Sequence, residues 1–124
     1  WVYENPAHTV AERTATWTAI LKEFSTNSID YTGLDAYREI GWQRQLHLFE
    51  VPFYYIEYGI AQLGAIGLWM QYQQNPKQAL QNYIKALSLG GTKTLPELYK
   101  AAGIEFNLSP DYIKTLMEFT AKEM

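Results

Sequence analysis

Helix-start signals recur along the whole of this 124-residue chain, and they constrain its fold more than any other feature. Residues 9–12 and 94–97 each read as a capping box, in which a threonine and a glutamate three positions later cap each other's backbone amides. Residues 75–76 and 109–110 each place a capping side chain before a proline, which suits the first turn of a helix. No segment alternates convincingly between apolar and polar residues, so the chain is predicted to be all-α.

Apolar residues at helical spacing predict about six helices. They are expected at about 10–24, 34–48, 52–73, 76–89, 95–103 and from 110 almost to the end of the chain. The third should be the longest. It should begin at about Pro52, because the residue before a proline is disfavoured in the α region and a break is expected there. It is apolar almost all round, and small residues at positions 61, 64, 65 and 67 would let neighbouring helices approach closely. We therefore expect one domain spanning 1–124, packed as a bundle around this long central helix.

The composition is that of a globular protein, with 48% hydrophobic and 19% charged residues. The net charge is −3 and there is no basic stripe, which argues against a nucleic-acid partner. No apolar stretch reaches the ~18 residues of a membrane helix, so no membrane partner is expected either. The chain has no cysteine and no secretory signal pattern, which fits a cytoplasmic location. It begins at Trp1 and not at methionine, so we expect it to be a fragment.

Metal-binding and catalytic motifs are absent from the sequence. It has no His-Glu-x-x-His, no glycine-rich phosphate loop and no Gly-x-Ser-x-Gly elbow. Its two histidines, His8 and His47, lie far apart and cannot hold zinc unless other ligands come from elsewhere. We therefore predict no metal-ligating residues and no complete catalytic site within this chain.

One tyrosine-rich stretch, residues 42–58, could still contribute to catalysis. On a helix, Tyr54 or Tyr55 would share one side with Tyr58, at spacings of four and three residues. A phenol stays protonated near neutral pH and can donate a hydrogen bond to a developing oxyanion, and the imidazole of His47 could donate alongside it.

The same stretch has a simpler interpretation. A tyrosine-rich helix is more often a packed core with a polar rim than an active site. Glu57 would be costly to bury unless it were paired, for instance with Arg44, or faced a wet cleft. The residues alone leave these alternatives open.

Residues 42–58, followed by 60–65, closely resemble the C-terminal region of oligoendopeptidase F, in the thimet-like family of zinc oligopeptidases. The opening residues 1–6 and the later segments 90–91 and 102–104 are also similar to that family. The resemblance implies a helical zinc peptidase that cuts short peptides in a deep channel. In the family, a His-Glu-x-x-His helix and a later glutamate hold the zinc, upstream of the region seen here.

The resemblance also implies roles for individual residues. His47, Tyr55 and Tyr58 match the catalytic histidine and tyrosines that face the metal and bind the peptide carbonyl, and Tyr54 matches a substrate-binding wall of the channel. The spacing from His47 to the tyrosines differs by one residue from the thimet-type branch, so the choice among the three tyrosines stays open.

We therefore expect the C-terminal portion of a zinc-dependent endopeptidase, with short peptides and the remaining N-terminal part of the peptidase as its partners. The zinc would be held by the full-length protein, and this chain alone would bind none and be inactive. The alternative is a non-catalytic helical peptide-binding or scaffold module, whose tyrosine-rich groove holds a peptide or a partner helix.

Overall fold

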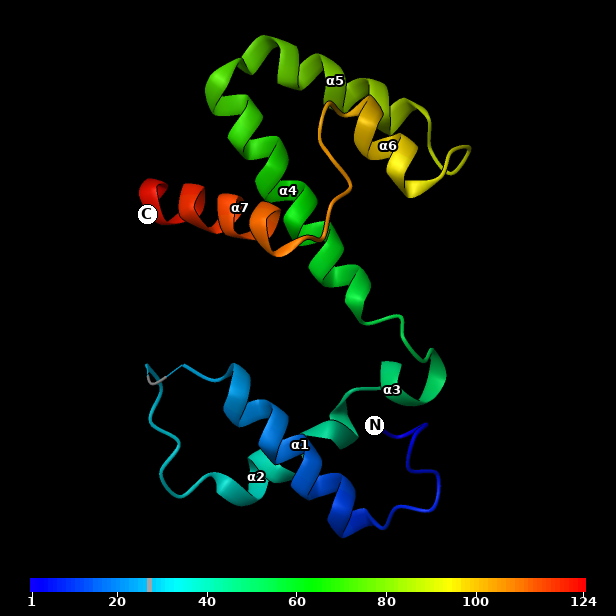
Figure 1. The fold of residues 1–124 in the computed structure, drawn as a ribbon, viewed down its shortest axis with the longest axis vertical. Coiled ribbons are helices and arrows are strands. Elements are labelled where there is room, and N and C mark those ends of the chain that lie inside the picture. Colours follow the sequence, from blue (N-terminus) through cyan, green and yellow to red (C-terminus); the bar gives the residue numbers. More distant parts are fainter. Residues whose placement is uncertain (27) are drawn as a thin grey trace. The chain divides into compact units, whose positions relative to one another are not determined.

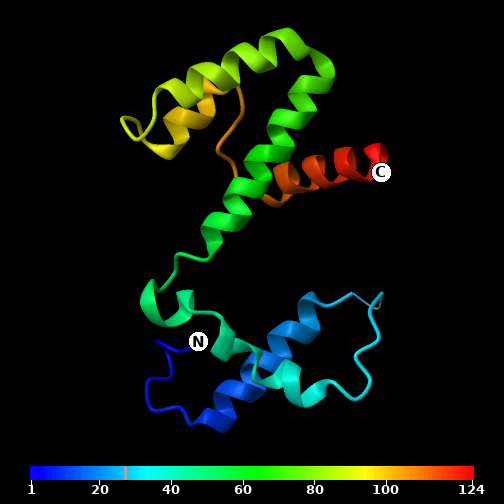
Figure 2. The same cartoon turned by 180° about the vertical axis from the view of Figure 1, so that it is seen from behind.

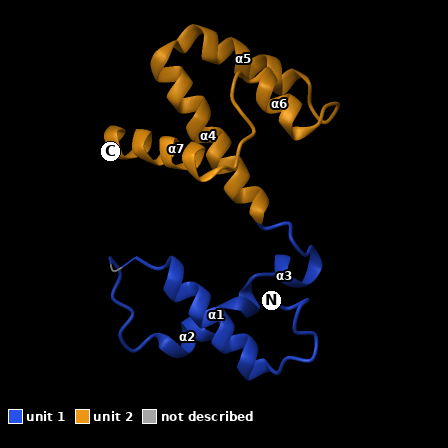
Figure 3. Ribbon diagram, in the orientation of Figure 1, with its two compact units in different colours: residues 1–55 blue, residues 56–124 orange. Residues whose placement is uncertain are grey.

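The computed structural model describes residues 1–26 and 28–124, and this part of the chain is helical without any strand (Figure 1). The prediction of an all-α protein is confirmed. The chain divides into two compact units, residues 1–55 and residues 56–124 (Figure 3). The elements of unit 1 are α1 Val10–Phe24, α2 Asp35–Glu39, the 3₁₀ helix η1 Gly41–Arg44 and α3 His47–Glu50. The elements of unit 2 are α4 Ile56–Gln74, α5 Pro76–Ser88, α6 Leu95–Ala101 and α7 Pro110–Glu123.

Both predicted capping boxes are present. At the start of α1, the Thr9 amide donates to the Glu12 carboxylate over 2.7 Å, and the Glu12 amide donates to the Thr9 hydroxyl over 3.2 Å. At the start of α6, the Thr94 amide donates to the Glu97 carboxylate over 2.9 Å. The bounds of α1 agree with those expected from the sequence, because its start depends on hydrogen bonds between residues only three positions apart.

The capping glutamates are expected to make stability depend on pH. Hydrogen bonds from the Thr9 backbone and then its hydroxyl lower the pKa of Glu12, and those from Thr94 lower the pKa of Glu97 in the same way. A pKa lowered by folding stabilises the protein above the ordinary glutamate pKa, and this stabilisation is lost as pH falls through the folded-state pKa. Thermal unfolding followed by circular dichroism should therefore show a smaller acid-induced fall in Tm for Glu12→Gln/Glu97→Gln than for the unsubstituted chain. The control Glu4→Gln should keep the full fall, and equal falls in all three proteins would contradict the prediction.

The prediction of one helix over residues 34–48 is wrong, because the structure has three short elements there, α2, η1 and α3. The indole Nε1 of Trp17, on α1, donates to the backbone oxygen of Arg38 over 3.0 Å. A Cβ at Gly41 would lie 3.2 Å from the same indole nitrogen, so the glycine allows α1 and the start of η1 to approach closely. The Arg38 backbone oxygen thus accepts from the Trp17 indole as well as from the Ile40 amide, at the point where α2 ends.

Trp42 anchors the following segment to α1. Its side chain is only 6% exposed, and its indole Nε1 donates to the Thr14 hydroxyl over 3.3 Å. The Arg13 guanidinium lies 4.7 Å from the centre of its ring, and the Phe49 ring lies 6.1 Å away. These contacts hold both ends of residues 42–49, the segment that contains His47.

In unit 2, α4 contacts α5 and α7, and α5 contacts α6, as the reverse view also shows (Figure 2). Leu116 of α7 is completely buried in this unit. A Cβ at Gly64 would lie 2.5 Å from the Tyr99 hydroxyl, which itself donates to the backbone oxygen of Ile60 over 2.7 Å. The expected close approach at a small residue of the long helix is therefore confirmed at Gly64.

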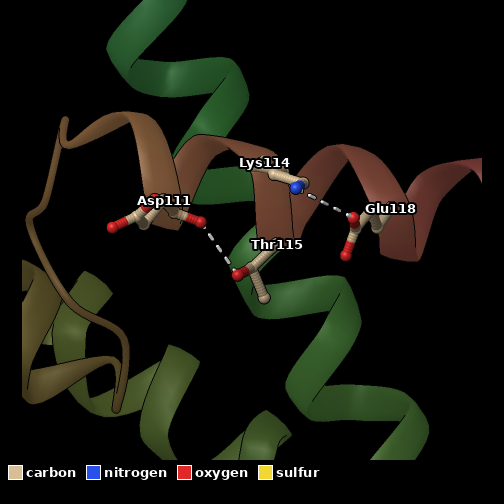
Figure 4. A network of polar contacts seen from close by, with 4 residues as sticks. All are labelled: Asp111, Lys114, Thr115 and Glu118. Atoms are coloured by element: carbon tan, nitrogen blue, oxygen red, sulfur yellow. Dashed lines mark hydrogen bonds and ion pairs between the residues drawn. The ribbon is translucent and has the colours of Figure 1, made fainter.

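The outer face of α7 carries polar contacts that are local to the helix (Figure 4). The Thr115 hydroxyl donates to the backbone oxygen of Asp111 over 2.9 Å, and Lys114 and Glu118 form an ion pair of 3.9 Å. Both charged side chains are largely exposed, so this pair contributes little to stability.

The long helix begins later than predicted, at Ile56 and not at Pro52, and it ends at Gln74. The expected bundle around this helix is not confirmed, because its helical neighbours α5 and α7 belong to unit 2. A single domain spanning residues 1–124 stays a prediction. Among the described residues, no helix is both long enough and apolar enough to cross a membrane.

Candidate functional site

A turn between α3 and α4 sets the position of the first two candidate tyrosines. Val51 is outside the α region, with φ −140° and ψ 73°, as its position before Pro52 requires. Phe53 has a positive φ of 65°, which a residue with a side chain adopts rarely and which cannot continue an α-helix. The Tyr54 amide donates to the Val51 backbone oxygen over 3.1 Å and closes the turn. Residues 52–55 are therefore not the first turn of a helix.

This turn places Tyr54 and Tyr55 against His47. The Tyr54 ring lies parallel to the imidazole, with the ring centres 6.3 Å apart and the planes at 1°. The Tyr55 ring stands edge-on, with the centres 5.1 Å apart and the planes at 80°. The two tyrosines are 52% and 50% exposed, while His47 is half-buried. We call these three residues the His47–tyrosine cluster; its rings lie within reach of a ligand.

Tyr58 lies in the first turn of α4, in unit 2, and is 56% exposed. Tyr54 and Tyr55 precede that helix, so the predicted common helix for the three tyrosines is wrong. The reason is the combination of Pro52, which forces Val51 out of the α region, and the positive φ of Phe53. The catalytic roles predicted for Tyr55 and Tyr58 do not depend on a shared helix and stay predictions.

Tyr55 also lines a cavity of about 950 Å³ in unit 1. The cavity lies among α1, α2 and η1, and its wall includes Tyr37, Arg38 and Arg44. Sequence reasoning did not mark these three residues as a group. The sequence predicted one continuous helix over 34–48, whereas the cavity lies where the structure has α2 and η1 in its place.

Glu57 is exposed and lines a second groove of about 430 Å³, in unit 2. Of the two alternatives for this carboxylate, the structure therefore agrees with the wet cleft. The groove also contains Tyr99, whose pKa is raised mainly by burial, with smaller contributions from Tyr112 and Glu57. Tyr99 is already committed to the Ile60 carbonyl and has a structural role.

The described residues do not fit a zinc site. Catalytic zinc usually has three protein ligands drawn from histidine, cysteine and carboxylates. Within residues 1–26 and 28–124, no group of three or more such side chains lies close enough together to hold a metal ion. No chemical step in this chain is therefore assigned to a metal held by its own residues.

Comparison with known proteins gives one match. The model of peptidase family M3 matches residues 1–118, which cover the His47–tyrosine cluster, Tyr58 and most of both units. No curated protein matches the chain, and no solved structure does. Since the family match extends over nearly the whole sequence, the chain belongs to peptidase family M3, a lineage of metallopeptidases.

Proposed function

We propose that this chain is the C-terminal portion of a cytoplasmic, zinc-dependent endopeptidase of the oligoendopeptidase F type, which hydrolyses short peptides. The family match over residues 1–118 supports the peptidase lineage. The resemblance of residues 42–58 to oligoendopeptidase F supports the narrower assignment.

The observation that carries the proposal is the edge-on packing of Tyr55 on His47, with half of the tyrosine surface exposed. Hydrolysis of a peptide bond places negative charge on the carbonyl oxygen in the transition state. A phenol O–H and an imidazole N–H held side by side can both donate to that oxygen, and preorganised donors lower the barrier more than mobile ones do. We assign this role to His47 and Tyr55. For Tyr58, which belongs to unit 2, the role of a further donor rests on the family resemblance alone.

Tyr54 has a different proposed role. Its ring is parallel to the imidazole, with the ring centres 6.3 Å apart, and has similar exposure to that of Tyr55. A flat aromatic surface beside the donors suits contact with the substrate backbone or an apolar side chain. We therefore assign Tyr54 to the wall that receives the peptide.

The ligands of the zinc are assigned to the N-terminal part of the peptidase catalytic domain. The isolated 124-residue chain should then contain far less than one tightly bound zinc per molecule by metal analysis, and should not cleave a quenched fluorescent peptide. A polypeptide that joins this chain to a His-Glu-x-x-His segment of the same family should bind zinc and cleave the peptide, and a chelator should abolish that cleavage.

Two results would contradict the proposal. Tight stoichiometric zinc in the isolated chain would show that its own residues form a metal site. A zinc-loaded longer polypeptide that binds short peptides without cleaving them would favour the non-catalytic peptide-binding module instead.

A further inference from the structure

The cavity of unit 1 has two basic side chains in its wall. Among the described residues that line it are Arg38 and Arg44 and no aspartate or glutamate. Its volume of about 950 Å³ lies within the usual range for sites that bind small ligands. The lining residues all lie within unit 1, so this unit alone forms the cavity. Arg38 also borders a neighbouring cavity, which is lined by Asp30 and Asp35. A cavity with two cations and no acidic side chain among its described lining residues is complementary to an anionic ligand.

Both arginines retain hydrogen-bond donors for such a ligand. The Arg38 guanidinium lies 3.9 Å from the centre of the Tyr31 ring, and its Nη2 donates to the Ser25 hydroxyl over 3.0 Å. A guanidinium has five N–H donors, so Arg38 is held in place and still has several to offer. Arg44 is exposed at the end of η1. In the part of the chain that the structure describes, neither arginine forms an ion pair with a carboxylate.

Tyr55 connects this cavity with the His47–tyrosine cluster. It stands edge-on to His47 and is also part of the cavity wall. A peptide whose carbonyl oxygen accepts a hydrogen bond from Tyr55 would therefore lie at the edge of the cavity. The walls supply the aromatic rings of Tyr31 and Tyr37 for apolar side chains and the arginines for a negative charge.

We propose that this cavity binds the C-terminal carboxylate of the short peptide substrate, with Arg44 as its main partner and Arg38 as the second. The inference rests on the proposed peptidase function. It adds a direction to the substrate, because the residues that follow the scissile bond would lie along the cavity of unit 1. The planar fork of a guanidinium can donate two parallel hydrogen bonds to a carboxylate, which favours a terminal carboxylate over a neutral amide.

The test compares two pentapeptides of the same sequence, Ala-Ala-Ala-Leu-Phe, one with a free C-terminal carboxylate and one with a C-terminal amide. Each is titrated into the ¹⁵N-labelled 124-residue chain while the arginine Nε–H resonances are followed by NMR. We expect the free acid to shift the Arg44 resonance and to bind roughly tenfold more tightly than the amide, the effect of one charge-assisted hydrogen-bonding contact. This comparison needs no substituted protein, so it cannot fail through misfolding.

Substitutions then locate the effect. Arg44→Gln removes the charge at an exposed position and should abolish the preference for the free acid, while Arg44→Lys should keep part of it. Lys77→Gln makes the same change of charge at an exposed position on α5, outside this cavity, and should leave the preference unchanged.

Three results would overturn the proposal: equal binding of acid and amide, a preference that survives Arg44→Gln, or acetate that shifts Arg44 as strongly as the peptide at equal concentration. The binding measurement involves no turnover and no zinc. Its failure therefore refutes the carboxylate site alone, whereas the metal and cleavage experiment tests the peptidase function itself.

Discussion

Replacing Tyr55 by phenylalanine is expected to lower kcat roughly 100-fold in the zinc-loaded peptidase that contains this chain, the usual effect of losing one oxyanion donor. The substitution removes only the phenolic oxygen and keeps the ring that packs edge-on against His47. Because that donor acts on the transition state more than on the bound substrate, KM should change little. Single-turnover cleavage of a quenched fluorescent peptide would measure the chemical step directly.

Tyr54 supplies a matched control for this experiment. It is exposed to the same degree as Tyr55 and also packs against His47, but its ring lies parallel to the imidazole. Tyr54→Phe should leave kcat within a few-fold, because a substrate wall needs the ring more than the hydroxyl. Thermal unfolding of both variants would show whether a lower kcat reflects a loss of stability or a loss of the chemical step. An unchanged kcat for Tyr55→Phe, or an equal loss in the two variants, would remove the oxyanion role from Tyr55.

Trp42→Ala is expected to destabilise unit 1 by roughly 3–5 kcal/mol, the usual cost of truncating a buried aromatic side chain to alanine. Trp42 is 6% exposed, accepts the Arg13 guanidinium over its ring and donates to Thr14, so the substitution loses packing and a polar contact together. Urea unfolding, followed by NMR signals from each unit, would measure the change. The signals of unit 2 should be less affected than those of unit 1.

Two further variants separate the causes of this loss. Trp42→Phe keeps an aromatic ring but has no N–H for Thr14, so it should lose less stability than the alanine variant. Trp1→Ala removes a tryptophan that is 42% exposed and should cost clearly less. A loss below about 1 kcal/mol for Trp42→Ala would show that this ring does not anchor the His47 segment, because fully buried large side chains cost more than that.

The features that the sequence predicted correctly are those that short-range interactions control. The starts of α1, α5, α6 and α7 depend on a side chain and an amide only three positions apart, so the residues themselves reveal them. The all-α class follows from the helical spacing of apolar residues. The peptidase family was recognisable from residues 42–58, and the family match over residues 1–118 bears this out.

Only the tertiary structure decided the geometry of the candidate site. The helix expected at 34–48 is interrupted where Trp17 donates to the carbonyl of Arg38, a contact between residues that are 21 positions apart. The cavity with Arg44 lies at that interruption, and the turn at Phe53 brings Tyr54 and Tyr55 close to His47. Helical periodicity describes neighbours along one helix and contains no information about a side chain from another helix that takes a backbone hydrogen bond. The sequence therefore determined which residues are candidates for the chemistry, whereas packing between distant segments determined which of them meet.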